Sequence, residues 1–105
     1  MDEKMVEIAF QLISHGGNAR GMAMEAINAA KQNNIEEARD LIKQAREEIL
    51  NAHEFQTTLI QDEASGVKNE LSILLVHAQG HLMTGMTVLD MAEEFVDVYE
   101  RIGKQ

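Results

Sequence analysis

The sequence predicts an all-α fold, an up-down-up bundle of three long helices. The first reason is composition: the 105 residues contain no proline and are rich in Ala, Leu, Glu, Met and Gln, which lose little conformational freedom in a helix. The second is periodicity, because apolar residues recur every three or four positions over three stretches separated by short polar breaks. We expect residues 1–105 to form a single domain.

The polar breaks set the expected helix boundaries. A first helix is predicted over residues 3–31. Asn34 followed by Glu37 has the spacing of a helix N-cap with an acid that bonds back to it, so the second helix is expected to begin there. The break at residues 64–66 offers Ser65 as the next cap, and a third helix is predicted from Val67 to Arg101.

The third helix is apolar on nearly all of its sides. Besides its main stripe it carries further apolar residues, namely Ile73, Val76, Met83, Val88 and Met91. A helix that is apolar on every side is expected to be buried on every side, whereas a three-helix bundle leaves one face of each helix exposed to solvent. We therefore expect a homo-oligomer in which the third helices of several copies meet on a symmetry axis.

Charge and composition exclude several classes of function. Eighteen acidic against nine basic residues give a net charge of −9, without a cluster of Lys or Arg, so nucleic acid and anionic membrane surfaces are not expected as partners. The absence of cysteine excludes disulfides, thiolate metal sites and thiol nucleophiles. No long apolar run predicts membrane insertion, and the acidic start is unlike a secretory signal, so we expect a cytoplasmic protein.

The stretch VHAQGHLMT, residues 76–84, is the candidate functional motif. On a helix His77 and His81 lie about 400° apart and stack on one face, one turn apart, with Thr84 a further turn along. Gln79 points about 200° away from His77, toward another surface such as a neighbouring subunit.

Four interpretations of the histidine pair are open on the residues alone. The histidines could be core residues that donate to carbonyl groups. They could form half of a zinc site, although no third ligand is nearby in the sequence. They could act as general acid and base, although no substrate pocket is evident. In the fourth interpretation one neutral imidazole attacks a phosphoryl donor while the other stabilises the added charge.

Other chemically capable side chains are interpreted structurally. His15 is expected on a helix surface and His53 at a boundary between helices. The methionines of the third helix, Met83, Met86 and Met91, are expected to fill the core. The acidic residues near its end are expected to form a solvated face; they are Glu93, Glu94, Asp97 and Glu100.

The motif resembles the VHAQDHLMT signature of the enzyme IIA components of lactose/cellobiose (N,N′-diacetylchitobiose) sugar phosphotransferase systems. Three other segments are similar to that family. They are ISHGGNARGMA (residues 13–23), in which a Gly precedes an Ala-Arg pair, AAKQNNIEEA (residues 29–38) and AHEFQTTLI (residues 52–60). The resemblance covers nearly the whole chain.

The resemblance implies a homotrimer of three-helix subunits, a nine-helix bundle that acts as a phosphocarrier. Such a protein accepts a phosphoryl group from phosphorylated HPr and passes it to a cysteine of its enzyme IIB, and sugar is phosphorylated as it crosses the membrane through IIC. The phosphoacceptor matches His77, whose Nε2 would attack phosphorus, and the signature's second histidine matches His81. Gln79 matches a signature glutamine that would act from an adjoining subunit. The implied sugars are cellobiose, lactose and related β-disaccharides.

One residue departs from the signature. Gly80 stands where the family has an aspartate that, with its symmetry copies, binds a metal ion on the trimer axis. Glycine has no ligand atom, so we expect no axial metal and no other cofactor, and a trimer held by apolar packing. Two alternative functions follow from the same residues: a helical interaction or regulatory module with idle histidines, and a metal-binding bundle that uses His77 and His81.

Overall fold

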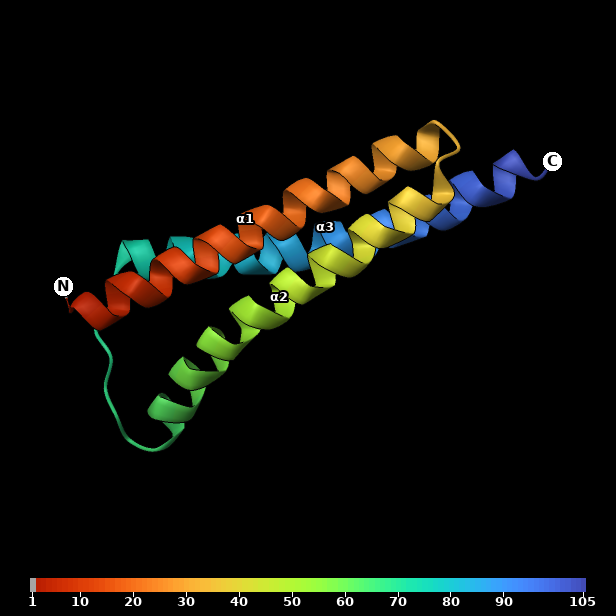
Figure 1. Cartoon of the computed structure of the whole chain (residues 1–105). Coiled ribbons are helices and arrows are strands. Elements are labelled where there is room, and N and C mark those ends of the chain that lie inside the picture. Colours follow the sequence, from red (N-terminus) through yellow and green to blue (C-terminus); the bar gives the residue numbers. More distant parts are fainter. Residues whose placement is uncertain (1) are drawn as a thin grey trace.

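In the computed structural model, which describes residues 2–105, three helices form an antiparallel bundle (Figure 1). They are α1 (Glu3–Lys31), α2 (Ile35–Ala64) and α3 (Ile73–Gly103). The chain runs up, down and up again, so its two ends lie at opposite ends of a rod of 56 × 21 × 17 Å. The predicted fold class is confirmed, and so are the bounds of the first helix.

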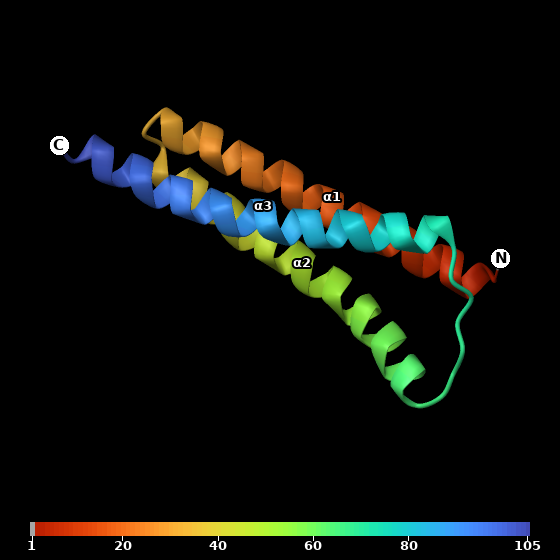
Figure 2. The ribbon, with the colours of Figure 1, turned by 180° about the vertical axis from the view of Figure 1, so that it is seen from behind.

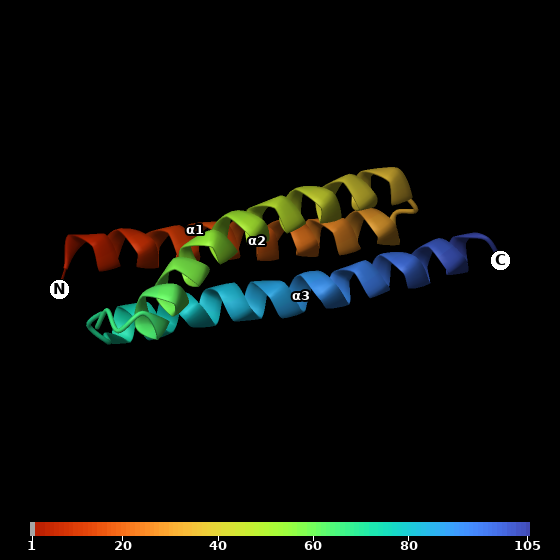
Figure 3. The ribbon, with the colours of Figure 1, turned by 90° about the horizontal axis from the view of Figure 1, so that it is seen from below.

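Small residues let the helices approach closely. Alanine dominates the buried positions, and the longer side chains fill the spaces between the helices; the largest fully buried ones are Met5, Leu12, Leu82, Leu89 and Val96. The core forms two clusters along the rod. Helix α1 packs along both partners, whereas α2 leans away from them toward its C-terminal end (Figures 1 and 2). Seen from below, that end of α2 crosses over the start of α3 (Figure 3).

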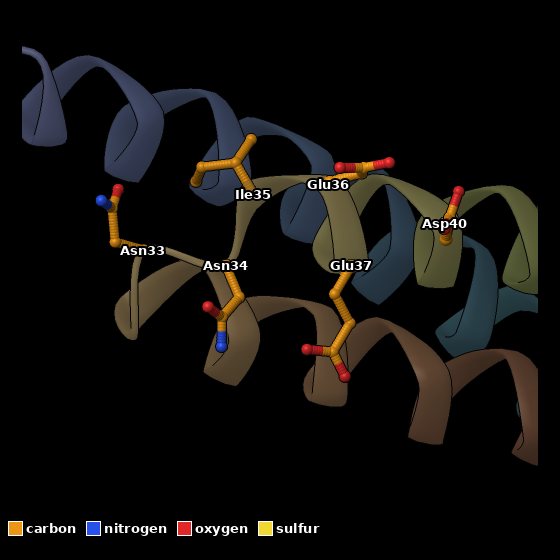
Figure 4. Close-up of a pocket in the computed structure, with 6 residues that line it drawn as sticks. All are labelled: Asn33, Asn34, Ile35, Glu36, Glu37 and Asp40. Carbon is orange, nitrogen blue, oxygen red and sulfur yellow. The ribbon is translucent and has the colours of Figure 1, made fainter.

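A tight turn joins α1 to α2. Asn33 adopts a left-handed conformation, with φ of 64°. The N–H groups of Asn33 and Asn34 donate to the carbonyls of Ala30 and Ala29, a Schellman motif that closes α1. Asn34 is at the N-cap of α2, but its side chain makes no cap hydrogen bond. The predicted capping box is therefore wrong, because Asn34 is already held by the end of α1; the turn residues are seen in Figure 4.

The second connection is longer than predicted. Gly66, with φ of 88°, ends α2 in another Schellman motif: its N–H donates to Glu63, and that of Val67 donates to Asp62. The chain is then non-helical until Ser72, whose hydroxyl accepts a hydrogen bond from the Leu75 N–H at 3.1 Å. The prediction that Ser65 caps a helix starting at Val67 is wrong. Glycine at this position ends one helix and does not begin the next.

Ion pairs connect α2 with the C-terminal half of α3. Arg39 Nη2 lies 2.7 Å from Asp97 and 3.0 Å from Glu100, and Arg46 Nη2 lies 3.0 Å from Glu93. The hydrogen bond to Asp97 is the main cause of a raised pKa of the Arg39 guanidinium. The predicted solvated acidic face is therefore partly an interhelix contact. Amphipathic spacing does not reveal which acids meet an arginine of another helix.

The outer face of α3 is apolar and uncovered within one chain. Ile73 is 89 % exposed, and Val98 and Ile102 are more than half exposed. Met83 and Met91 are also exposed, so the prediction that they fill the core of the subunit is wrong, whereas Met86 does pack against it. None of the helices within residues 2–105 combines the length and the apolarity that a membrane crossing requires.

Candidate functional site

The two histidines of the motif meet on α3. His77 is exposed and His81 is half-buried. Their rings stand edge to face with centroids 4.6 Å apart, and the two Nε2 atoms are 3.1 Å apart. The helix supplies this arrangement, because residues four apart lie on the same face. The interpretation of both histidines as core residues is wrong for His77, whose ring is exposed.

The short distance between the Nε2 atoms constrains the protons. One nitrogen must carry a hydrogen and the other must offer a lone pair, since two lone pairs would repel each other. If His81 donates, His77 carries its own proton on Nδ1 and presents a nucleophilic lone pair at Nε2. The same His81 N–H is then within reach of any group that becomes attached to His77.

A hollow of about 280 Å³ surrounds the histidines. It is lined by His77, Gly80, His81 and Thr84 of α3 and by Arg20 of α1. The structure thus brings together the predicted residues His77, His81 and Thr84. It adds Arg20, which the motif could not reveal because that residue lies 57 positions before His77 in the chain. The signal in the sequence that could have indicated Arg20 is its place one turn after Gly16, a small residue at which another helix can pack closely.

Two glycines set the distance between α1 and α3 beside this hollow. A Cβ added to Gly16 would lie 3.0 Å from the carbonyl oxygen of His81, and one added to Gly85 would lie 2.8 Å from the carbonyl oxygen of Gly16. Both contacts are with the main chain, so no side-chain rotation can relieve them. Arg20 lies one turn after Gly16 and His81 one turn before Gly85, so the crossing fixes how the two sides of the hollow face each other.

Replacing Gly85 with alanine is expected to lower the free energy of unfolding by about 1–3 kcal/mol, because the helices must move apart. Gly17→Ala is the matched control. A Cβ there meets nothing within 4 Å, so alanine should raise stability by about 0.5–1 kcal/mol through helix propensity. Urea unfolding at one protein concentration measures both. Equal shifts of the same sign would show that the crossing does not require glycine.

Gln79 is not in the hollow. Its Oε1 accepts a hydrogen bond of 2.8 Å from Gln56 of α2 in the same chain. The prediction that it points away from His77 is therefore confirmed. The surface that it meets within the subunit is α2.

The remaining histidines occupy positions opposite to those predicted. His15 is half-buried between helices, where Nδ1 lies 2.6 Å from Glu48 and Nε2 lies 3.1 Å from Gln11, and its ring stacks on Phe55. His53 is exposed on α2. Sequence spacing did not show that α2 brings Glu48 and Phe55 to His15.

The donor set does not suit an axial metal ion. Gly80 has no side-chain ligand, and an added Cβ there would meet nothing within 4 Å. Across residues 2–105, no three His, Asp or Glu side chains are grouped as metal ligands within one chain. The histidine pair alone is an incomplete zinc site.

A larger hollow, of about 740 Å³, lies at the α1–α2 turn and away from the histidines (Figure 4). It is lined by the side chains of Asn33, Asn34, Ile35, Glu36, Glu37 and Asp40. Carboxylates and amides on one turn offer no nucleophile comparable to an exposed imidazole. The candidate site is therefore the smaller hollow.

Comparison with known proteins agrees with the histidine motif. The family model described as "PTS system, Lactose/Cellobiose specific IIA subunit" matches residues 7–100. The lichenan-specific phosphotransferase enzyme IIA component of Bacillus subtilis is 55 % identical over 105 residues, which cover 100 % of this chain and 96 % of that protein. The N,N′-diacetylchitobiose-specific EIIA component of Escherichia coli K12 is 36 % identical over 100 residues, which cover 95 % and 86 %.

Solved structures show the same similarity. The PTS cellobiose-specific enzyme IIA of Bacillus anthracis superimposes with a TM-score of 0.96 at 48 % identity, covering 100 % of this chain and 96 % of that one. A chain of the Escherichia coli complex of IIA(Chitobiose) with HPr gives a TM-score of 0.82 at 35 % identity, covering 97 % and 99 %. The predicted resemblance is confirmed: this chain belongs to the lactose/cellobiose-specific family of phosphotransferase-system IIA subunits.

Proposed function

We propose that this IIA subunit is a phosphocarrier in which Nε2 of His77 accepts a phosphoryl group from phosphorylated HPr and passes it to the cysteine of an enzyme IIB. The observation that carries the proposal is the pairing of an exposed His77 with His81, whose Nε2 atoms are 3.1 Å apart. The solved complex of a IIA(Chitobiose) with HPr supports HPr as the donor.

The transfer is a displacement at phosphorus. The Nε2 lone pair of His77 forms the new N–P bond while the bond between phosphorus and the donor breaks, and that electron pair leaves with the donor. The N–H of His81, released from His77, then donates to a phosphoryl oxygen. A phosphoramidate keeps a high transfer potential, which a carrier needs to pass the group on. His77 is the fifth residue of α3, just beyond the first turn, within which the helix dipole acts most strongly.

Two further residues support this chemistry in the proposal. Thr84 lines the hollow, and its hydroxyl can donate to a phosphoryl oxygen. Gln79 bonds to Gln56 within the subunit, and we propose that its amide supports the site of an adjoining subunit. The arrangement uses no metal ion or other cofactor.

We further propose that the subunits assemble as a trimer through the outer face of α3. The support is a stripe of residues that recur every three or four positions along that face and are exposed in the single chain. It consists of Ile73, His77, Gly80, Thr84, Thr87, Met91, Phe95, Val98 and Ile102. A repeat of seven residues is the pattern of helices that pack around a common axis. Five of these nine residues are large and apolar, namely Ile73, Met91, Phe95, Val98 and Ile102, and monomeric proteins rarely leave so many uncovered on one face.

The implied pathway is the uptake and phosphorylation of a β-linked disaccharide or oligosaccharide by a cytoplasmic IIA acting with enzymes IIB and IIC. Relatives named for lichenan, lactose and N,N′-diacetylchitobiose support this class of sugar. The sugar itself meets IIB and IIC and not this chain.

The test is incubation with phosphoenolpyruvate, enzyme I and HPr. We expect the intact chain to gain the mass of one phosphoryl group, in an acid-labile and alkali-stable form typical of phosphohistidine, and to lose it when a matching IIB is added. A chain that gains no mass while a known IIA in the same mixture is phosphorylated would instead be a helical interaction module with idle histidines.

A further inference from the structure

The side of the hollow that faces the histidine pair is formed by Arg20. Four of the five lining residues come from α3, and Arg20 alone comes from α1. Arg20 is exposed. Beyond the histidines, Arg20 is the only cationic residue among those that line the hollow.

Ion pairing sets Arg20 apart from two of the other three arginines of the bundle. Arg39 and Arg46 are held by carboxylates of α3. Within residues 2–105, Arg20 has no carboxylate within ion-pair distance. In a chain of net charge −9, an unpaired arginine beside an exposed imidazole provides positive charge for an anion at that point. Arginine also stays protonated at every relevant pH and presents several N–H donors to phosphate oxygens.

The backbone fixes this placement. Gly16 and Gly85 hold α1 against α3 through main-chain contacts, and Arg20 follows Gly16 by one helical turn. The backbone position of Arg20 relative to His77 and His81 therefore depends on this crossing, whereas its side chain is exposed to solvent. Such an arrangement can bind a phosphoryl group and release it again.

We propose that Arg20 is a catalytic residue that binds the phosphoryl oxygens while the group is transferred to and from His77; this inference rests on the proposed function. Arg20 gives and takes no proton. It donates N–H bonds to oxygens whose negative charge is retained through the transfer, and it opposes the repulsion between the incoming dianion and the acidic protein. The His81 N–H and the guanidinium would then approach the phosphoryl group from two helices.

The experiment compares Arg20→Gln with Arg101→Gln, which removes the same charge from an exposed arginine near the far end of α3. Single-turnover transfer from phosphorylated HPr should slow about tenfold in Arg20→Gln, the loss expected for one partly solvated charge-assisted hydrogen bond. Arg20→Lys should lose less, and Arg101→Gln should match the wild type.

A second readout excludes effects on docking and on folding. In the isolated phosphorylated protein, ³¹P NMR titration should give a higher pKa for the phosphoryl group in Arg20→Gln than in the wild type, because a nearby cation favours the dianion. A purely structural role would leave this pKa unchanged. Circular dichroism checks the fold, and Arg20→Met provides the same measurement should the glutamine variant fold poorly.

The outcomes separate the two proposals. If the wild type is phosphorylated on His77 while Arg20→Gln equals Arg101→Gln in both rate and phosphoryl pKa, the role of Arg20 is refuted and the phosphocarrier function stands. If the wild type accepts no phosphoryl group from a competent donor system, both proposals fail.

Discussion

Replacing His77 with alanine is expected to abolish phosphoryl acceptance, because the substitution removes the proposed nucleophile. His81→Ala should still be phosphorylated, but about 10- to 100-fold more slowly, because one charge-assisted hydrogen bond to the transferred group is lost. Mass spectrometry of the intact chain over time, with phosphorylated HPr as donor, measures both rates.

The matched control is His53→Ala, which removes an exposed histidine of α2 that does not line the hollow and should be phosphorylated at the wild-type rate. If His77→Ala kept its phosphorylation and His81→Ala lost it, His81 would be the acceptor. The direction of the 3.1 Å hydrogen bond between the Nε2 atoms would then have to be reversed.

Replacing Val98 with aspartate is expected to convert the proposed trimer into monomers. Val98 is 52 % exposed in the single chain and lies between Phe95 and Ile102 in the apolar C-terminal part of the stripe on α3. In the trimer three carboxylates would be buried close together, and the effective desolvation penalty is about several kcal/mol for each ion. Sedimentation velocity measures the change in mass.

Leu50→Asp is the control, since Leu50 is 64 % exposed on α2 and the same change there should leave the trimer intact. Adding a chelator to the wild type should also change nothing, because Gly80 provides no metal ligand. Gly80→Asp, which introduces the aspartate of the VHAQDHLMT signature, should make assembly sensitive to the chelator. A wild-type trimer that dissociates in chelator would contradict metal-free packing.

Local patterns predicted the elements of this fold better than their junctions. The three helices follow from composition and from apolar spacing, which act within a few residues. The start of α3 could not be placed, because a helix end depends on which of Ser65, Gly66 and Ser72 satisfies the exposed backbone groups. Each of these residues is suited to a helix end, and only the path of the whole chain selects among them.

The residues of the candidate site also differ in how far the sequence predicted them. His77, His81 and Thr84 share one helix face, so their spacing in the sequence already specifies their proximity. Arg20 joins them only through the packing of α1 on α3, which depends on contacts between distant segments. For the same reason the partners of His15 on α2 were not foreseen.

The contact between Gly16 and Gly85 also limits how this protein can evolve. In most cores a larger residue at one position can be offset by a smaller residue opposite. Here the atoms that an added Cβ would meet are main-chain atoms, which every amino acid carries. A second substitution at the facing position therefore cannot restore the lost space. Both positions should therefore remain glycine, because no second substitution compensates for a larger residue there. The spacing of α1 and α3 beside the hollow is thus set by these glycines and does not depend on the residues that line it.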